Sequence, residues 1–409
     1  MAKNRTGPVR QPDQLNFAAA SMPTLTISER GTARLKSGHV WVYRSDIVSA
    51  DGIAPGALAA VQDQRGRFLG SALYSSASQI AVRMFSRQPV PDLPTLLRER
   101  IRQAIEYRKL VVRDSDAYRV VFSEGDFLPG LIIDRYNDIV SLQILTQAMD
   151  SDGARQTLLS ELSDQLHPAS IVERVDAHVR ELEQLPARES GLLAGEKTST
   201  VFTMNGVRFQ YSALEGQKTG AFLDQRENYA AAARYANGEV LDVFCYQGGF
   251  ALHLARSCSR VTGVDSSRPA LEMADRNAAL NGLEIEWLEA NAFDLLKDYS
   301  AAGRQYDTII LDPPAFAKSR KNLETALRGY KELNLRALKM LRRGGILVTC
   351  SCSYHVSQAD FLAMLTSAAL DAGRLLRVLE YRTQAKDHPI VATVPETSYL
   401  KAIIFHVTY

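Results

Sequence analysis

Short apolar runs separated by glycine and polar residues dominate the segment from Thr24 to about Ser86. This alternation is typical of short β-strands, and five or six of them so close together predict a small barrel rather than a helical module. A helix is expected over residues 93–112, where apolar side chains recur near a 3.6-residue period. Residues 1–22 are polar, contain Pro8 and Pro12 and lack periodicity, so we expect a flexible lead-in there.

The next part of the chain mixes strands and helices. Strands are predicted over residues 118–123, 131–134, 139–145 and 170–174. A helix is predicted over residues 153–166, and residues 185–199 are predicted to form a loop. A hairpin should follow, turning at Asn205-Gly206, because Asn-Gly is the preferred pair for a two-residue hairpin turn.

From about Ala221 onward, strands alternate with helices, which predicts a mostly parallel sheet covered by helices on both faces. The predicted strands are residues 239–244, 260–265, 284–288, 306–311, 345–350, 375–381 and 399–407. The fold class is therefore α/β, with a doubly wound C-terminal domain, a central α+β domain and an N-terminal β-barrel. The expected limits are 1–22 for the lead-in, 23–92 for the barrel, 93–212 for the central domain and 213–409 for the C-terminal domain.

The first strand of the predicted parallel sheet leads into a glycine-containing turn. Asp242 lies within this strand, and Gly248 and Gly249 follow before a helical run that begins near Ala251. Glycines in such a turn let backbone amides approach a ligand closely. The turn has neither the G-x-G-x-x-G spacing of dinucleotide sites nor the lysine of a P-loop, so a phosphate cradle is disfavoured.

A second acid, Asp265, ends the next strand, where a carboxylate can accept hydrogen bonds from the hydroxyls of an adenosine ribose. S-adenosylmethionine has a ribose, an adenine and a cationic sulfonium but no phosphate, so two acids favour it as the ligand. The alternative is an ordinary nucleotide-binding half with Asp265 on the ribose of NAD. After the third strand, Asn291 is a candidate for the adenine edge and Phe293 for its ring, unless both belong to a plain turn.

The fourth strand ends in an acid followed by two prolines, Asp312-Pro313-Pro314, with Phe316 two residues later. Prolines make a loop rigid and leave backbone carbonyls without competing N–H groups. Together with Asp312, these carbonyls can hold the amino edge of a nucleobase, and Phe316 offers a stacking face. The carboxyl end of a parallel strand is also where such folds place their chemistry.

The fifth strand ends in two cysteines, Cys350 and Cys352, with His355 close behind. A cysteine beside a nucleobase can add as thiolate to C6 of a pyrimidine, which makes C5 nucleophilic enough to take a methyl group. Inert strand cysteines are one alternative, and a metal bound by Cys-x-Cys-x-x-His is another. Metal is disfavoured because no second ligand pair with zinc-like spacing exists elsewhere in the sequence.

Composition and charge add to this interpretation. Hydrophobic residues make up 46% of the 409 residues and charged residues 23%, the ordinary mix of a globular protein, which excludes chain-wide disorder. Four cysteines are too few for a disulfide framework, no apolar stretch is long enough to span a bilayer, and no signal core follows the N-terminus, so we expect a cytoplasmic protein.

The net charge of +2 is unevenly distributed. Residues 1–110 carry 16 Lys/Arg against 8 Asp/Glu, a balance of +8, and the remaining residues sum to −6. This asymmetry favours a basic module for a polyanion joined to an acidic body, although a solvated surface that is merely basic is the alternative.

Several motifs together carry a family resemblance. The matching segments are residues 38–43, 68–74, 128–136, 217–226, 246–250, 312–316, 351–353 and 387–389. In this order they resemble the bacterial large-subunit ribosomal RNA cytosine-C5 methyltransferases. Those proteins join an N-terminal PUA domain, a central α/β domain and a Rossmann-like class I S-adenosylmethionine-dependent methyltransferase domain. The resemblance extends from about residue 24 to the C-terminal end.

The resemblance implies that a PUA-like barrel contacts RNA and that S-adenosylmethionine is the cofactor. The cofactor-binding residues are then expected to be Gln225, Asp242, Tyr246, Gly248, Asp265, Asn291 and Asp312. It also implies a nucleophile in the Ser-Cys-Ser stretch, where Cys352 occupies the family position and position 350 is often a different residue. Many related enzymes carry another cysteine directly after the Asp-Pro-Pro-like motif, but Ala315 stands there in this chain. The group that removes the C5 proton is therefore not identified.

We expect an enzyme that forms 5-methylcytosine in 23S rRNA through a covalent bond between Cys352 and C6. Asp312 is expected to orient the base and share a proton at N3, with Pro313, Pro314 and Phe316 binding the substrate and no metal involved. The expected partner is 23S rRNA, either naked or in a partly assembled large subunit, and no membrane is involved. Whether the protein forms a homodimer is left open.

Two other functions remain open at this point. Asp312 and the prolines also suit methylation of an exocyclic amine, a reaction in which the nitrogen attacks directly and no cysteine is needed. A non-catalytic RNA-binding assembly factor with a relic methyl-donor fold is the other, although the acids and Cys352 argue against a relic. For the barrel alone, the alternative is a protein-binding module.

Overall fold

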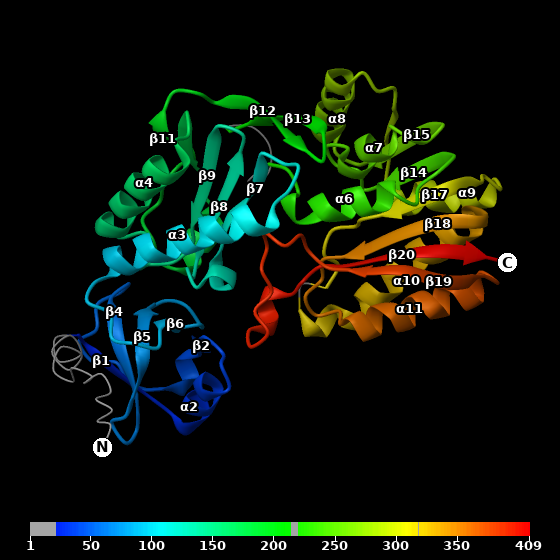
Figure 1. Cartoon of the computed structure of the whole chain (residues 1–409). Helices are drawn as coiled ribbons and strands as arrows, with labels where there is room; N and C mark the ends of the chain where they lie inside the picture. Colours follow the sequence, from blue (N-terminus) through cyan, green and yellow to red (C-terminus); the bar gives the residue numbers. More distant parts are fainter. Residues whose placement is uncertain (1–21, 214–219, 318) are drawn as a thin grey trace, which may run out of the picture.

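The computed structural model describes residues 22–213, 220–317 and 319–409. The lead-in expected over residues 1–22 lies almost entirely outside the described residues, and so does the first part of the motif at 217–226. Four β-sheets make up the described chain. Figure 1 shows an N-terminal part at the lower left, a central part above it, and a large C-terminal part at the right. The domain limits given above remain predictions.

The N-terminal part is a six-stranded sheet with the order β2-β6-β5-β4-β1-β3, in which only the β1–β4 pair is parallel among the described pairings. Its strands are β1 (Thr24–Ile27), β2 (Trp41–Val42), β3 (Ile47–Ser49), β4 (Leu58–Asp63), β5 (Phe68–Tyr74) and β6 (Val82–Ser86). The expectation of a purely β module missed α2 (Glu29–Lys36). Ser28 caps this short, charged helix, and Asp46 holds it through ion pairs with Arg30 and Arg34.

The central part is a five-stranded sheet with the order β11-β10-β9-β8-β7. Its elements are α3 (Leu93–Val111), β7 (Ala117–Phe122), β8 (Leu131–Tyr136), β9 (Ile139–Ile144), α4 (Asp152–Leu166), β10 (Ser170–Glu173), α5 (Ala177–Leu182) and β11 (Gly191–Gly195), with a 3-10 turn at Ser123–Asp126. The prediction of a loop over residues 185–199 is wrong for β11, an exposed edge strand. None of its side chains is buried, so the sequence shows no apolar alternation, and antiparallel pairing with β10 supplies its order.

The hairpin turning at Asn205-Gly206 is confirmed. It joins β12 (Ser199–Met204) to β13 (Val207–Ser212), and both turn residues have a positive φ, as this type of turn requires. Phe202 and Phe209 stack with their ring centroids 5.5 Å apart. Their side chains join the core of the C-terminal part, so the hairpin serves as a bridge between the two larger sheets.

The C-terminal part is a seven-stranded sheet with the order β16-β15-β14-β17-β18-β20-β19. All described pairs are parallel except those of β20, which runs antiparallel to both neighbours. The strands are β14 (Glu239–Val243), β15 (Arg260–Asp265), β16 (Glu286–Glu289), β17 (Tyr306–Leu311), β18 (Leu341–Ser351), β19 (Leu375–Arg382) and β20 (Lys401–Thr408). The doubly wound architecture is therefore confirmed, and the strand order reverses direction between β14 and β17.

Helices cover both faces of this sheet and build two separate cores. One face carries α6 (Arg226–Ala233), α7 (Gly249–Leu254) and α8 (Arg268–Asn281). The other carries α9 (Ala292–Ala301), α10 (Leu323–Met340) and α11 (Gln358–Asp371). Single turns of 3-10 helix lie at η1 (Arg44–Asp46), η3 (Leu223–Gln225), η4 (Arg320–Asn322) and η5 (Pro395–Thr397). Ligands in such folds bind beyond the carboxyl ends of the strands, where the order reverses.

The segment of residues 383–400, between β19 and β20, joins all three parts, and in Figure 1 it descends in red toward β2. Asp387 is fully buried and accepts hydrogen bonds from Arg226 Nη2 at 2.9 Å and from the Arg119 backbone N at 2.8 Å. Arg108 Nη2 donates to the Asp387 carbonyl at 2.6 Å. At the far end, Glu396 Oε2 lies 3.0 Å from His39 Nε2. The Asp-His-Pro motif therefore belongs to a structural junction.

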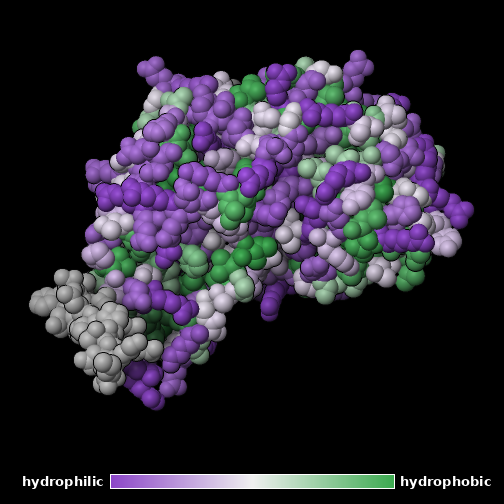
Figure 2. Space-filling model, viewed as in Figure 1, coloured by the Kyte–Doolittle hydropathy of each residue, from purple (hydrophilic) through white to green (hydrophobic). Residues whose placement is uncertain are grey.

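Hydrophilic side chains cover most of the face shown in Figure 2, and hydrophobic ones gather only in small patches there. Within the three described stretches, no helix combines the length and the apolarity needed to cross a bilayer.

Candidate active site

The glycine turn after β14 has a backbone shape that few residues adopt. Phe244 and Tyr246 have φ values of 68° and 49°, and Gly248, which precedes α7, has 84°. This left-handed sequence folds the chain back so that Asp242 Oδ2 accepts a hydrogen bond of 2.9 Å from the Ala251 backbone N. The carboxylate of the strand and the first turn of the helix are thereby locked together.

Asp242 is a buried carboxyl group in an electrostatically unfavourable position. It is fully buried, and its second oxygen, Oδ1, has no hydrogen-bond partner in the described part of the chain. Burial raises the pKa of this carboxyl to about 8, with smaller contributions from the charges of Asp312 and Asp265. An isolated buried acid is costly to the fold, so this position indicates a bound cation or hydrogen-bond donor.

Asp265 stands at the end of the neighbouring strand, β15. Its Oδ2 accepts a hydrogen bond from the Tyr246 backbone N and its Oδ1 one from the Ser267 backbone N, both at 2.9 Å. Each oxygen keeps a second acceptor site. A carboxylate oriented in this way can receive the two hydroxyls of a ribose, and contact between Asp265 and a ribose stays a prediction.

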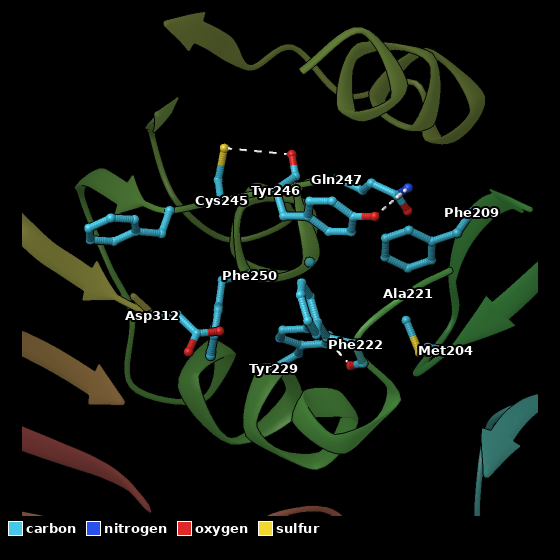
Figure 3. Close-up of a pocket in the computed structure, with 12 residues that line it drawn as sticks. Met204, Phe209, Ala221, Phe222, Tyr229, Cys245, Tyr246, Gln247, Phe250 and Asp312 are labelled. Carbon is cyan, nitrogen blue, oxygen red and sulfur yellow. Dashed lines mark hydrogen bonds between the residues drawn. The ribbon is translucent and has the colours of Figure 1, made fainter. Parts of the chain in front are cut away.

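A small pocket, open to solvent, lies beside the turn. Figure 3 shows Asp312 and the segment from Cys245 to Gln247 bordering it. The rings of Phe222 and Tyr246 meet edge to face at its margin, with centroids 5.0 Å apart. Aromatic walls with a few polar groups are typical of small-molecule sites.

Asn291 has a role that the sequence did not reveal. It is the N-cap of α9, and its side-chain oxygen accepts hydrogen bonds from the backbone N of Phe293 at 2.9 Å and of Asp294 at 3.4 Å. Its amide NH₂ group is left to donate to a ligand, so contact with the adenine edge stays a prediction. The Phe293 side chain is exposed.

Asp312 lies at the end of β17, next to the reversal of strand order. Gln225 Nε2 donates to its Oδ1 at 3.0 Å, and Gln225 Oε1 in turn accepts from Asn228 Nδ2 at 2.6 Å. Burial, followed by the charge of Asp224, raises the pKa of the Asp312 carboxyl to about 7. Asp312 can therefore exchange a proton near neutral pH.

Cys352 lies directly across from the proline motif. Its Sγ is 3.8 Å from the carbonyl oxygen of Pro313, and its side chain is half-buried, whereas Cys350 is fully buried. Burial raises the pKa of the Cys352 thiol to about 11, helped by the charges of Asp312 and Asp224. The geometry therefore brings the two strand-end motifs of the sequence analysis together and leaves Cys352 the more accessible of the two thiols.

The loop between the two motifs is fixed by Ser353. Its Oγ accepts a hydrogen bond of 3.1 Å from the Ala317 backbone N and shares one of 2.9 Å with the Tyr330 hydroxyl. Pro313 is buried and Pro314 exposed. Phe316 packs against Tyr330, with ring centroids 4.7 Å apart, so one of its faces is occupied by the core.

Three polar residues of the site escaped the sequence analysis. Lys401, at the start of β20, places its Nζ 2.6 Å from the Ser353 carbonyl and 2.8 Å from that of Tyr399. Burial lowers the pKa of Lys401 to about 8. Asp224 and Tyr399 form a hydrogen-bonded pair beside Gln225. Asp224 lies within the motif of residues 217–226 but was not singled out, and Tyr399 and Lys401 reach the site from a segment far along the chain. Within the described stretches, no group of three or more His, Cys, Asp or Glu side chains is arranged to hold a metal ion.

Comparison with known proteins identifies the family of this chain. Residues 143–406 match the S-adenosylmethionine-dependent methyltransferase family, and residues 25–87 match the PUA-like domain. The chain belongs to the S-adenosylmethionine-dependent methyltransferase family. S-adenosylmethionine is thus its methyl donor, and the orphaned Asp242 oxygen and the double acceptor Asp265 fit a ligand with a cationic end and a ribose.

Named relatives of this methyltransferase span nearly its whole length. A protein of Shewanella amazonensis called Ribosomal RNA large subunit methyltransferase I is 39% identical over 381 residues, covering 90% of this chain and 95% of the relative. A protein of the same name from Yersinia pseudotuberculosis is 38% identical over 375 residues, covering 89% and 94%.

Solved structures share the fold of this methyltransferase at low sequence identity. A structure described as a methyltransferase complexed with SAH aligns with a TM-score of 0.81 at 19% identity, covering 94% of this chain and 100% of its own. A structure described as a SAM-dependent methyltransferase from Streptococcus mutans aligns with a TM-score of 0.79 at the same identity and coverage. The class I methyltransferase fold with an N-terminal PUA-like domain is thereby confirmed.

Proposed function

We propose that this methyltransferase forms 5-methylcytosine in 23S ribosomal RNA through a covalent adduct between Cys352 and C6 of the target base. The observation that carries the proposal is the placement of the Cys352 thiol 3.8 Å from the Pro313 carbonyl, beside Asp312. The names of the relatives support large-subunit ribosomal RNA as the substrate class. The PUA-like domain and the +8 balance of residues 1–110 support an RNA-binding surface.

The chain's own residues would hold the cytosine in the following way. The Pro313 carbonyl accepts a hydrogen bond from the exocyclic amine, and Asp312 faces N3. With its pKa raised to about 7, the protonated Asp312 carboxyl can donate to N3 while C6 is attacked. This proton is needed because electron density moves from the C5–C6 double bond into the ring when sulfur adds.

Cys352 must lose its proton to act, and the site shapes that step. At a pKa of about 11 the thiol is largely protonated at neutral pH, so the thiolate is a minor and strongly nucleophilic form. The charge of Lys401 acts in the opposite sense, favouring the thiolate. When bound, S-adenosylmethionine supplies an electrophilic methyl group to the C5 that this addition has activated.

The experiment that tests the proposal compares Cys352→Ala with Cys350→Ala. Protein-free 23S rRNA and isotope-labelled S-adenosylmethionine are incubated with each variant, and the methylated nucleosides are identified by mass spectrometry. Cys352→Ala should lose 5-methylcytidine formation by at least ~10³-fold, and Cys350→Ala should retain most of it. Donor affinity serves as the control for folding. Normal 5-methylcytidine formation by Cys352→Ala would refute the covalent route.

Methylation of an exocyclic amine is the second candidate, and the Asp312-Pro313 arrangement favours it. Under that reading the label appears in a methylated amine and both cysteine variants keep their activity. The non-catalytic alternative predicts no label although RNA is bound. Label absent from naked RNA but present in a partly assembled large subunit would instead identify the particle as the substrate.

A further inference from the structure

Asp224, which the sequence analysis did not single out, presents a free carboxylate oxygen inside the site. Its Oδ2 accepts a hydrogen bond of 2.6 Å from the Tyr399 hydroxyl. Its backbone carbonyl accepts one of 2.7 Å from the Ala385 backbone N, which fixes the turn. Its Oδ1 is buried and has no hydrogen-bond partner among the described residues. A buried oxygen without a partner costs free energy, so its presence indicates a group that arrives with the substrate.

The charge of Asp224 reaches the two groups that would touch the reacting base. After burial, it contributes to raising the pKa of the Asp312 carboxyl and of the Cys352 thiol. Because Coulombic interaction falls with distance, both groups lie within range of the Asp224 charge. It is also joined to Asp312 through the chain, since its neighbour Gln225 donates to Asp312.

The neighbouring ionisable groups are less suited to remove a proton. Lys401 Nζ directs its hydrogens to two carbonyls, those of Ser353 and Tyr399, which holds it as a donor. Asp312 is engaged by Gln225 and faces N3 in the proposed reaction. A carboxylate held by one oxygen and free at the other, as in Asp224, is the usual geometry of an oriented base.

We propose that Asp224 is the base that removes the C5 proton, an assignment that rests on the proposed cytosine-C5 reaction. After methyl transfer, C5 carries both the methyl group and its original hydrogen. The C5–H bond breaks, its proton passes to Asp224 Oδ1, and its electron pair forms the C5–C6 double bond. The C6–S bond breaks in the same step, its electrons leave with Cys352 as thiolate, and the proton on N3 returns to Asp312. The proton on Asp224 afterwards exchanges with solvent.

Tyr399 acts in this scheme as a positioning residue. Its hydroxyl holds Oδ2 and so aims Oδ1 at the ring. Removing the hydroxyl should therefore lower kcat while leaving KM for RNA unchanged. A structural role alone would not lower kcat selectively.

The test uses Asp224→Asn in the full chain, with protein-free 23S rRNA and S-adenosylmethionine labelled in the methyl group. Release of 5-methylcytidine should slow by about 100-fold or more, the usual value of a positioned base. A protein–RNA complex that survives denaturing electrophoresis and carries the labelled methyl should accumulate. Asp275→Asn, a neutralised acid on the exposed face of α8, is the matched control and should behave as wild type.

Two outcomes would overturn the assignment: product release at the wild-type rate, or loss of product and complex together while donor binding is kept. If Asp224→Asn fails to bind the donor, Tyr399→Phe decides instead. A lower kcat with the labelled complex visible during turnover supports the assignment, and an unchanged kcat overturns it.

Failure of the underlying reaction would look different. RNA containing 5-fluorocytidine traps the wild-type enzyme covalently, because fluorine cannot leave C5 as a proton does. No trapped complex with wild type would refute the cytosine-C5 adduct itself. A trapped complex together with a fully active Asp224→Asn variant would refute only the role of Asp224.

Discussion

Replacing Asp242 by asparagine should change the stability of the donor-free protein in a way that depends on pH. The carboxyl has a pKa of about 8 in the fold, against 3.8 ordinarily. An acid whose pKa is raised by folding contributes its full stability below pH 3.8 and loses it progressively as the pH rises to about 8. Each pH unit in that window removes about 1.4 kcal/mol from the wild type but nothing from the variant.

The structure sets the size of the effect. A rise of about four pH units corresponds to at most about 6 kcal/mol of lost stability at pH 8, and to about 2 kcal/mol at pH 5. The asparagine amide would find no acceptor where Oδ1 now stands unpartnered, which costs about 1–3 kcal/mol at every pH. We therefore expect Asp242→Asn to have about the same stability as wild type at pH 5. At pH 8 it should be more stable than wild type by about 3 kcal/mol.

Urea unfolding in a Trp41→Phe background measures this directly. The chain has two tryptophans, Trp41 and Trp287. Trp287 lies over the glycines of the site, since a Cβ built on Gly263 or Gly248 would meet its ring at 2.4 or 2.9 Å, so it reports on the domain that contains Asp242. A stability difference between variant and wild type that is constant from pH 5 to pH 8 would refute the reasoning.

Bound S-adenosylmethionine should reverse the order of stability of wild type and Asp242→Asn. A ligand with a cationic sulfonium and amine favours the ionised carboxylate, and so offsets the free-energy cost of burying that charge. Saturating S-adenosylmethionine should stabilise the wild type more than Asp242→Asn, seen as a larger thermal shift. Equal shifts in the two proteins would mean that Asp242 does not face the donor.

Two further predictions concern protons and domain contacts. The wild-type rate of methylation should rise about tenfold per pH unit below pH 7, as the Cys352 thiolate increases, and then flatten as Asp312 loses its proton. The rate of Asp312→Asn should keep rising to pH 9. A wild-type profile that is flat below pH 7 would contradict this. Asp387→Asn should cost about 3–5 kcal/mol in thermal or urea unfolding, because Arg226 would lose its buried partner, while Glu272→Gln, in an exposed pair, should stay within about 0.5 kcal/mol. Equal effects of these two substitutions would contradict the junction.

The sheet of the C-terminal part could be predicted because buried parallel strands are continuous apolar runs, and the acids at their ends stand out against them. Asp242, Asp265 and Asp312 were visible for that reason. The hairpin at Asn205-Gly206 was predictable because its turn depends on two adjacent residues. In each of these places, the information is local.

Elements stabilised by distant contacts were not predictable. Helix α2 depends on Asp46 for its ion pairs, and β11 owes its order to pairing with β10. Asn291 was expected to face a ligand, but its side-chain oxygen caps α9. Asp224 and Tyr399 are 175 positions apart and meet only in the folded chain. The spacing of these two residues in the sequence does not reveal their hydrogen bond.

The segment of residues 383–400 has a consequence for how the chain is made. The PUA-like domain leaves the ribosome first, yet Gly38 packs so closely on Thr393 that an added Cβ would lie 2.6 Å from its methyl group, and Glu396 pairs with His39. These partners emerge more than 350 positions later. Early domains generally fold as they appear. Here the earliest domain can contact the central part early, through Trp41 with Glu124 and Ser75 with Glu183. Its contacts with the segment of residues 383–400 form only at the end of synthesis.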